Sequence, residues 1–110
     1  MIYLASPYSH SNPAVMEERF ESACIVAGEL MKVGEHVFSP VAHSRPIANL
    51  VDLPHDFEFW AKYDTQMISL CDEVVVLTLP GWEESRGVAA EIKIAEELGK
   101  PVRYFERIPA

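Results

Sequence analysis

The feature that most constrains the fold is an unbroken run of apolar residues, Val74–Leu77, inside a predicted strand from Glu73 to Leu79. A strand with one solvent-exposed face alternates apolar and polar residues, whereas this one is apolar at each central position. Such a strand is buried on both faces, as in a parallel sheet. Parallel neighbours need crossover connections, which are usually helices. The run therefore predicts an α/β fold.

The rest of the chain supplies strands and helices in alternation. Prolines predict an irregular segment over Pro40–Pro54, just before the second helix. The order is β-α-β-α-β-α-β, which predicts a three-layer Rossmann- or flavodoxin-like sandwich with a four- to five-stranded parallel sheet. We expect one domain over residues 1–110. The other predicted strands are Ile2–Ala5, Glu35–Ser39 and Pro101–Phe105, and the helices run from Pro13 to Gly34, from Asp56 to Cys71 and from Ser85 to Leu98.

Composition excludes several classes of function. Asp plus Glu is 17 and Lys plus Arg is 9, and the net charge of −8 repels nucleic-acid backbones. Met1 leads directly into the first predicted strand, and no apolar run is long enough for a membrane span, so we expect a cytoplasmic protein. Neither the phosphate- and dinucleotide-binding glycine motifs nor a zinc-ligand spacing is present. The sequence implies no metal and no cofactor.

A glutamate interrupts the apolar stripe of the third predicted helix. Glu91 lies three residues after Val88 and four before Ala95, so it shares their face. A half-buried carboxylate costs stability unless a partner compensates it. The positive potential of the helix N-terminus near Ser85 favours the ionised form, which suits a nucleophile. The alternative is a structural ion pair with Arg86, Lys93 or Arg103.

An aspartate interrupts the second predicted helix in the same way. Asp64 lies four residues after Trp60 and three before Met67. A carboxyl group on this more apolar helix suits a raised pKa and proton transfer. Two carboxylates in different environments are typical of glycosidic bond cleavage. The alternative is a structural hydrogen bond to Tyr63 or Tyr3.

Three motifs carry a family resemblance over most of the chain. They are Ile2–Tyr8, Asp64–Val76, and Ser85–Glu91 followed by Gly99–Val102. With these motifs in this order, the chain resembles the nucleoside 2-deoxyribosyltransferases and the related N-glycosidases of deoxynucleoside 5′-monophosphates. It is most similar to a small bacterial and phage group placed beside that family. The resemblance implies a nucleoside deoxyribosyltransferase-like fold and a nucleoside or nucleotide substrate.

The resemblance also implies roles for individual residues. Glu91 matches the nucleophile that attacks the anomeric carbon, and Asp64 matches the acid that assists departure of the base. Tyr3 matches the tyrosine that orients the nucleophile. Ser85 and Gly87 match the loop that contacts the sugar or its phosphate. Sites of this family are completed by a neighbouring subunit, so a homo-oligomer, a dimer or a tetramer, is implied.

Five further residues are candidates for substrate binding. Ser6, Tyr8 and Ser9 lie in the first loop, where hydroxyls and a helix N-terminus can hold a phosphate. Tyr8 either closes the pocket or only lines the loop. His43 lies in the irregular segment and either contacts the base or phosphate or is an ordinary surface histidine. Arg86 either neutralises a phosphate or pairs with a neighbouring glutamate.

The chain departs from the family at two places, and these leave alternatives open. The transferases often carry Asp where this chain has Ser85, whereas the monophosphate hydrolases carry Ser, which favours a phosphorylated substrate. The first loop, however, lacks the glycine- and arginine-rich motif of those hydrolases. Fold alone does not fix function. A nucleotide-binding sensor without turnover, or an oligomeric interaction domain, stays an alternative to an enzyme.

Overall fold

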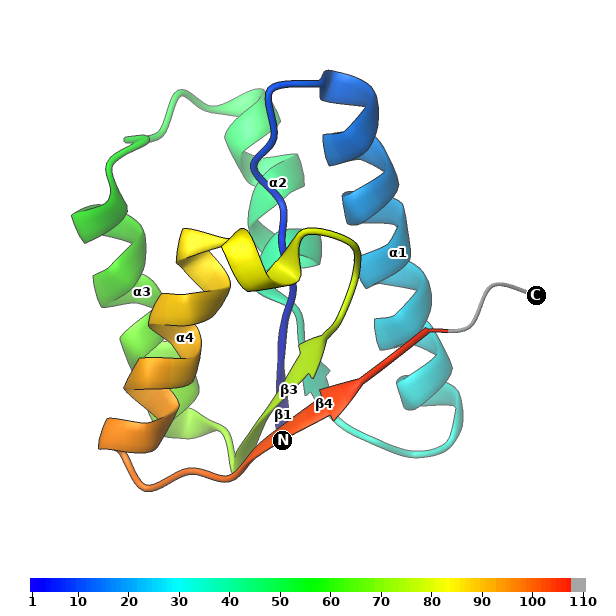
Figure 1. Cartoon of the computed structure of the whole chain (residues 1–110), viewed down its shortest axis with the longest axis vertical. Helices are drawn as coiled ribbons and strands as arrows, with labels where there is room; N and C mark the ends of the chain where they lie inside the picture. The colour runs from blue at the N-terminus through cyan, green and yellow to red at the C-terminus, as the bar shows by residue number, and fades with distance from the viewer. Residues whose placement is uncertain (108–110) are drawn as a thin grey trace.

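The structure, a computed structural model, describes residues 1–107 and contains four strands in one parallel sheet of order β2-β1-β3-β4 (Figure 1). The α/β prediction and the four-stranded sheet are confirmed. The strands are β1 (Ile2–Ala5), β2 (Val37–Phe38), β3 (Glu73–Leu77) and β4 (Val102–Phe105). The helices are α1 (Pro13–Lys32), α2 (Pro40–Leu50), α3 (Phe57–Leu70) and α4 (Arg86–Glu97), with a short 3₁₀ helix at Trp82–Glu84.

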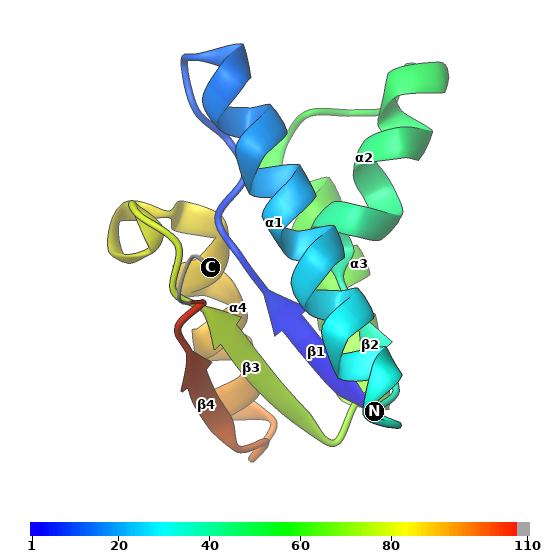
Figure 2. The same ribbon diagram turned by 90° about the vertical axis from the view of Figure 1, so that its right-hand side faces the viewer.

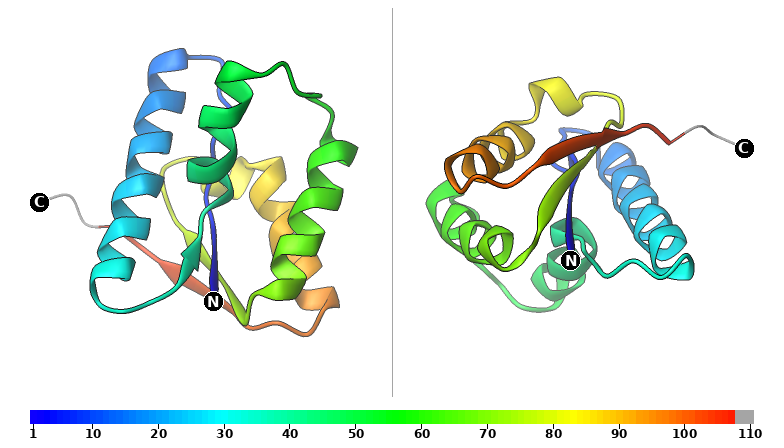
Figure 3. Two further views of the ribbon diagram at one scale, coloured as in Figure 1. Left: turned by 180° about the vertical axis from the view of Figure 1, so that it is seen from behind. Right: turned by 90° about the horizontal axis from the view of Figure 1, so that it is seen from below.

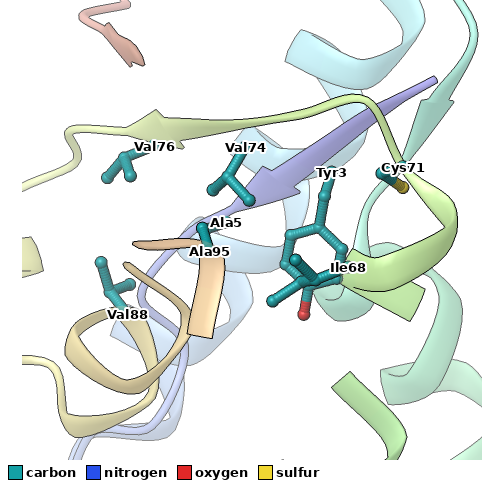
Figure 4. Close-up of a cluster of buried hydrophobic side chains, with 8 residues drawn as sticks. All are labelled: Tyr3, Ala5, Ile68, Cys71, Val74, Val76, Val88 and Ala95. Atoms are coloured by element: carbon teal, nitrogen blue, oxygen red, sulfur yellow. The ribbon is translucent and has the colours of Figure 1, made fainter. Parts of the chain in front are cut away.

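Helices cover both faces of the sheet, as the apolar run in β3 predicts. Helix α1 lies on one face and helices α3 and α4 on the other (Figures 2 and 3). The alternation within β1 divides its side chains between two cores, because successive residues point to opposite faces. Leu4 belongs to the same buried cluster as Val26 of α1. Tyr3 belongs to the cluster on the other face, which contains Ile68 of α3 and Val88 of α4 (Figure 4).

The prediction of an irregular segment over Pro40–Pro54 is wrong for its first eleven residues, which form α2. The Ser39 hydroxyl caps this helix by accepting a hydrogen bond from the Ala42 amide, and Pro40 occupies the first turn, where no amide hydrogen is needed. Pro46 lies inside the helix and removes one backbone hydrogen bond, a cost that the cap and the contacts with α1 and β1 offset. His43 therefore lies on a helix and not in a loop.

The carboxyl ends of the strands lead into the segments that carry the candidate residues. β1 runs into Ser6–Asn12, and Asn12 caps α1 through a hydrogen bond from the Ala14 amide. β3 runs into the segment that ends at Ser85, the N-cap of α4. Both segments follow neighbouring parallel strands, so they meet at one edge of the sheet. No helix in residues 1–107 is long and apolar enough to cross a membrane.

Candidate active site

Glu91 is buried in the core face of α4 and meets Tyr3 from the centre of the sheet. The Ser85 hydroxyl accepts a hydrogen bond from the Val88 amide, which fixes the start of α4 and so the face on which Glu91 lies. Glu91 is 5% exposed and Tyr3 is fully buried. The Tyr3 hydroxyl donates a hydrogen bond to the Glu91 carboxyl group. The buried Glu91 carboxyl group thus has a hydrogen-bond donor, the Tyr3 hydroxyl of β1.

Asp64 is the third member of this cluster. It lies half-buried on α3, which packs against α4. Burial raises the pKa of Asp64 and the Tyr3 hydroxyl opposes this shift, whereas the charge of Asp64 adds to the effect of burial on the pKa of Glu91. We refer to Tyr3, Asp64 and Glu91, contributed by β1, α3 and α4, as the carboxyl cluster.

Both carboxyl groups of the cluster hold their protons more tightly than ordinary acids. Burial, and then the charge of Asp64, raises the pKa of Glu91 from 4.5 to about 8, although the Tyr3 hydrogen bond opposes the shift. Burial raises the pKa of Asp64 from 3.8 to about 6, against the same hydroxyl. Burial and the two neighbouring carboxylates raise the pKa of Tyr3 far above its ordinary value, so this hydroxyl stays a donor. Near neutral pH the two acids share roughly one proton.

The expectation that the helix N-terminus keeps Glu91 ionised is therefore wrong. Glu91 is the sixth residue of α4, and the field of a helix terminus falls off within the first turn. Removal from water destabilises an ionised carboxylate by more than this weak field stabilises it. Glu91, the acid expected to be ionised, therefore has a higher pKa than Asp64.

Among the described residues, Glu91 forms no salt bridge with any of the three partners considered, which are Arg86, Lys93 and Arg103. Within residues 1–107, Arg103 pairs with Glu73, and the Arg86 guanidinium lies 4.1 Å from the centre of the Phe57 ring. In the part of the chain that the structure describes, Arg86 forms no salt bridge with a neighbouring glutamate, and its expected contact with a phosphate stays a prediction. For Asp64, the Tyr3 hydroxyl opposes the rise of its pKa, and the same hydroxyl donates its hydrogen bond to Glu91.

Of the predicted first-loop residues only Ser9 lies, with Ser85, at a second feature, a shallow pocket of about 380 Å³. Ser9 and Ser85 line it, and Ser9 is exposed, whereas Tyr8 is half-buried. Ser6 is 5% exposed, and its hydroxyl has no hydrogen-bond partner within the described residues. Gly87 is exposed in the first turn of α4. The complete lining is Ser9, His10, Arg19, Gly81, Glu84 and Ser85.

His43 belongs to a chain of aromatic rings that starts at the carboxyl cluster and continues to α3. The Tyr3 ring lies 5.8 Å from that of Phe38, which lies 5.2 Å from that of His43. The His43 ring lies 6.1 Å from that of Tyr63, one residue before Asp64 on α3. Centroid spacings of this size are typical of interacting aromatic rings. The structure thus places His43 beside the acid-bearing helix.

Sequence reasoning missed Arg19, which contacts both loops at this edge of the sheet. The Arg19 guanidinium donates hydrogen bonds to the carbonyl oxygen of Ser9, at 2.9 Å, and to that of Pro80, at 3.0 Å. No local motif marks such a residue, because its acceptors are backbone groups ten and 61 residues away. Phe38 is likewise predicted only as part of a strand, although it links the Tyr3 and His43 rings.

The fold is that of a nucleoside deoxyribosyltransferase-like α/β protein. The structure is similar to that of a 2-deoxyribosyltransferase from the psychrotolerant bacterium Bacillus psychrosaccharolyticus, with a TM-score of 0.65 and 26% sequence identity over 99% of this chain and 76% of that one. That enzyme is described as a biocatalyst for the industrial synthesis of antiviral and antitumoral nucleosides. The chain belongs to the family described as a domain of unknown function, DUF1937, whose model matches residues 1–107. No curated protein matches the sequence.

Replacing Tyr3 by Phe is expected to raise the pKa of Glu91 above its value of about 8. The substitution keeps the ring and removes the hydroxyl whose hydrogen bond favours the ionised carboxylate. The measurement is a ¹³C NMR titration of the carboxyl carbons in both proteins. Tyr104→Phe removes a hydroxyl from an exposed tyrosine of β4 and serves as the control. A Glu91 pKa that falls, or stays fixed, in Tyr3→Phe would contradict the assignment of the hydroxyl.

Proposed function

We propose that this protein cleaves or transfers the N-glycosidic bond of a deoxynucleoside or its 5′-monophosphate through a covalent glycosyl–Glu91 intermediate. The observation that carries the proposal is the carboxyl cluster. It combines a buried acid held by a tyrosine hydroxyl with a second acid on the facing helix. Retaining glycosidic cleavage needs one ionised and one protonated carboxyl group, and we take as the reactive form the one in which Asp64 holds the shared proton and Glu91 is ionised. The likeness to a deoxyribosyltransferase supports the substrate class.

In the proposed reaction, a carboxylate oxygen of Glu91 attacks the anomeric carbon of the sugar. The bond from that carbon to the base nitrogen breaks, and its electron pair leaves with the base, which takes the proton of Asp64. A water or a second base then attacks the same carbon and breaks the ester bond to Glu91, whose oxygen regains the electron pair. Asp64 accepts the proton released by the incoming nucleophile. The Tyr3 hydroxyl holds the carboxylate oriented before attack.

The remaining candidates fit the two ends of such a substrate. His43 and its aromatic neighbours lie beside α3, where a departing base would meet Asp64. Ser9 and Ser85 line the pocket at the start of α4, where hydroxyls and free amide hydrogens suit the 5′ end of a sugar or its phosphate. We extend the proposal to these sites, and to a second copy of the chain that completes them in a homo-oligomer.

One observation favours the second candidate function, a nucleotide-binding module without turnover. Glu91 is 5% exposed, so a sugar can reach its carboxyl group only if neighbouring side chains move. A module that only binds would have no need of that access. Calorimetry separates the two functions, because a binding module returns the nucleotide intact after tight binding.

The test of the proposed function is an assay for free base with a panel of deoxynucleosides, ribonucleosides and their 5′-monophosphates. Chromatography after incubation identifies the released base, and adding a second base separates transfer from hydrolysis. Mass spectrometry of the protein after rapid acid quenching detects a sugar attached to the peptide that contains Glu91. If no member of the panel yields free base at high protein concentration, the proposal is wrong.

The rate of base release is expected to follow a bell-shaped pH profile with limbs near pH 6 and pH 8. Below the lower limb both carboxyl groups are protonated and no nucleophile remains, and above the upper limb neither can protonate the base. Between the limbs the proton is on either Asp64 or Glu91, and a titration does not distinguish these two forms. The two limbs therefore give the pKa values of the pair and not of either residue alone. The measurement is kcat/KM against pH, which reflects the free protein. If kcat/KM keeps rising through pH 8 and does not fall, the proton shared by Asp64 and Glu91 is not the one that protonates the leaving base.

A further inference from the structure

We infer that Arg19 is a positioning residue that holds the two substrate loops, Tyr8–Asn12 and Pro80–Ser85, at a fixed separation. Neither the carboxyl cluster nor the family motifs identify this residue. The effect of Arg19 on substrate binding rests on the proposed function, whereas its effect on the two loops does not. The hydrogen bonds of the guanidinium and the close packing around it support the role.

The Arg19 side chain bridges two segments that are far apart in the sequence. From the second turn of α1, one terminal nitrogen donates to the Ser9 carbonyl at 2.9 Å and to the Tyr8 carbonyl at 3.4 Å. The other donates to the Pro80 carbonyl at 3.0 Å. A guanidinium can do this because its nitrogens form a rigid planar fork, which an ammonium group lacks. Arg19 takes part in no salt bridge within residues 1–107, so carbonyl groups alone hold it.

The chain leaves room for this contact at Gly81. The backbone of Gly81 has a φ of +89°, which favours glycine, and a Cβ added there would lie 2.5 Å from the Arg19 terminal nitrogen. A side chain at position 81 would therefore displace the guanidinium as well as strain its own backbone. The glycine serves the close approach of Arg19 in addition to the turn.

The bridge sets the opening of the pocket at the start of α4. Arg19 lines this pocket together with Ser9 of the first loop and Ser85 of the second. Fixing the Ser9 and Pro80 carbonyls relative to one side chain fixes the distance between the two serine-bearing segments. The carboxyl cluster lies on β1, α3 and α4, so the bridge governs how the remote end of a substrate is held more than the reacting carbon.

The loops are tested without any substrate by ¹⁵N relaxation of the 110-residue chain and its Arg19→Met variant. In the wild type we expect order parameters of about 0.85 for both loops, and in the variant values below about 0.6 for Tyr8–Asn12 and Gly81–Glu84. Arg19→Lys is expected to behave like Arg19→Met, because an ammonium group cannot reach both carbonyls. Arg103→Met is the matched control, since that arginine contacts Glu73 on the sheet and neither loop.

Gly81→Ala tests the bridge from its other side. Strain at position 81 alone would loosen Pro80–Ser85, whereas displacement of Arg19 also loosens Tyr8–Asn12. We expect both loops to loosen. Unchanged order parameters for Tyr8–Asn12 in Arg19→Met and Gly81→Ala, or full restoration by Lys, would overturn the inference.

With a substrate identified by the panel, Arg19→Met is expected to raise KM about tenfold or more and to change kcat by less than about threefold. The limbs of the pH profile should stay near pH 6 and pH 8, because the carboxyl cluster is untouched. A loss confined to kcat would overturn the positioning role. If the loops loosen as expected but the wild type cleaves nothing, the proposed function fails and the bridge stands.

Discussion

Replacing Glu91 by Gln is expected to lower the rate of base release by roughly 10⁴-fold, because the variant has no carboxylate to attack the sugar. The amide fills the space of the protonated acid and can still accept the Tyr3 hydrogen bond, so the packing of α4 against the sheet persists. Asp64 and the substrate loops are unchanged, and the affinity for substrate should change little. The measurement is single-turnover release of free base by both proteins under saturating conditions.

Two controls separate chemistry from damage to the fold. Glu97→Gln makes the same change at an exposed position of α4 and should leave the rate unchanged. Asp64→Asn removes the acid and keeps the nucleophile, and is expected to cost roughly 10²- to 10⁴-fold, the usual contribution of general acid catalysis. Base release by Glu91→Gln at the wild-type rate would end the covalent mechanism even if Asp64→Asn were inactive.

The architecture could be predicted from the sequence because its strongest signals are local. The apolar run of β3 demands cover on both faces, and the caps at Asn12, Asp56 and Ser85 mark the starts of α1, α3 and α4. α2 was missed because Pro40 and Pro46 suggest a loop, although a proline in the first turn of a helix favours its start. Whether an internal proline is tolerated depends on tertiary contacts that local patterns do not reveal.

The site was predictable only where it interrupts a periodic pattern. Glu91 and Asp64 could be found because each occupies an apolar stripe, whereas Arg19 lies on α1 without any such signature and acts through distant carbonyl groups. The protonation states were predicted wrongly for a related reason. Periodicity shows that a residue faces the core but not how completely it is removed from water. That degree of removal decides the pKa of Glu91.

The same burial predicts that this protein loses stability as the pH rises from 4.5 to about 8. In this range the folded protein keeps the proton of Glu91, whereas the unfolded chain releases it. The folded state therefore binds more protons, and the free energy of unfolding falls with increasing pH. Below pH 4.5 the acid is protonated in both states, and above pH 8 it is ionised in both. Asp64 adds a loss of the same sign between pH 3.8 and about 6.

Glu91→Gln isolates the contribution of Glu91, because the amide is neutral at every pH. The variant should match the wild type near pH 4.5 and exceed its free energy of unfolding by a few kcal/mol near pH 8. Urea titrations at several pH values measure the difference, and Glu97→Gln, an exposed position, should follow the wild type throughout. A variant less stable than the wild type at pH 8 would show that the folded protein stabilises the ionised carboxylate. Glu91 would then be held ready as a nucleophile, and the shared proton and the bell-shaped profile would both have to be abandoned.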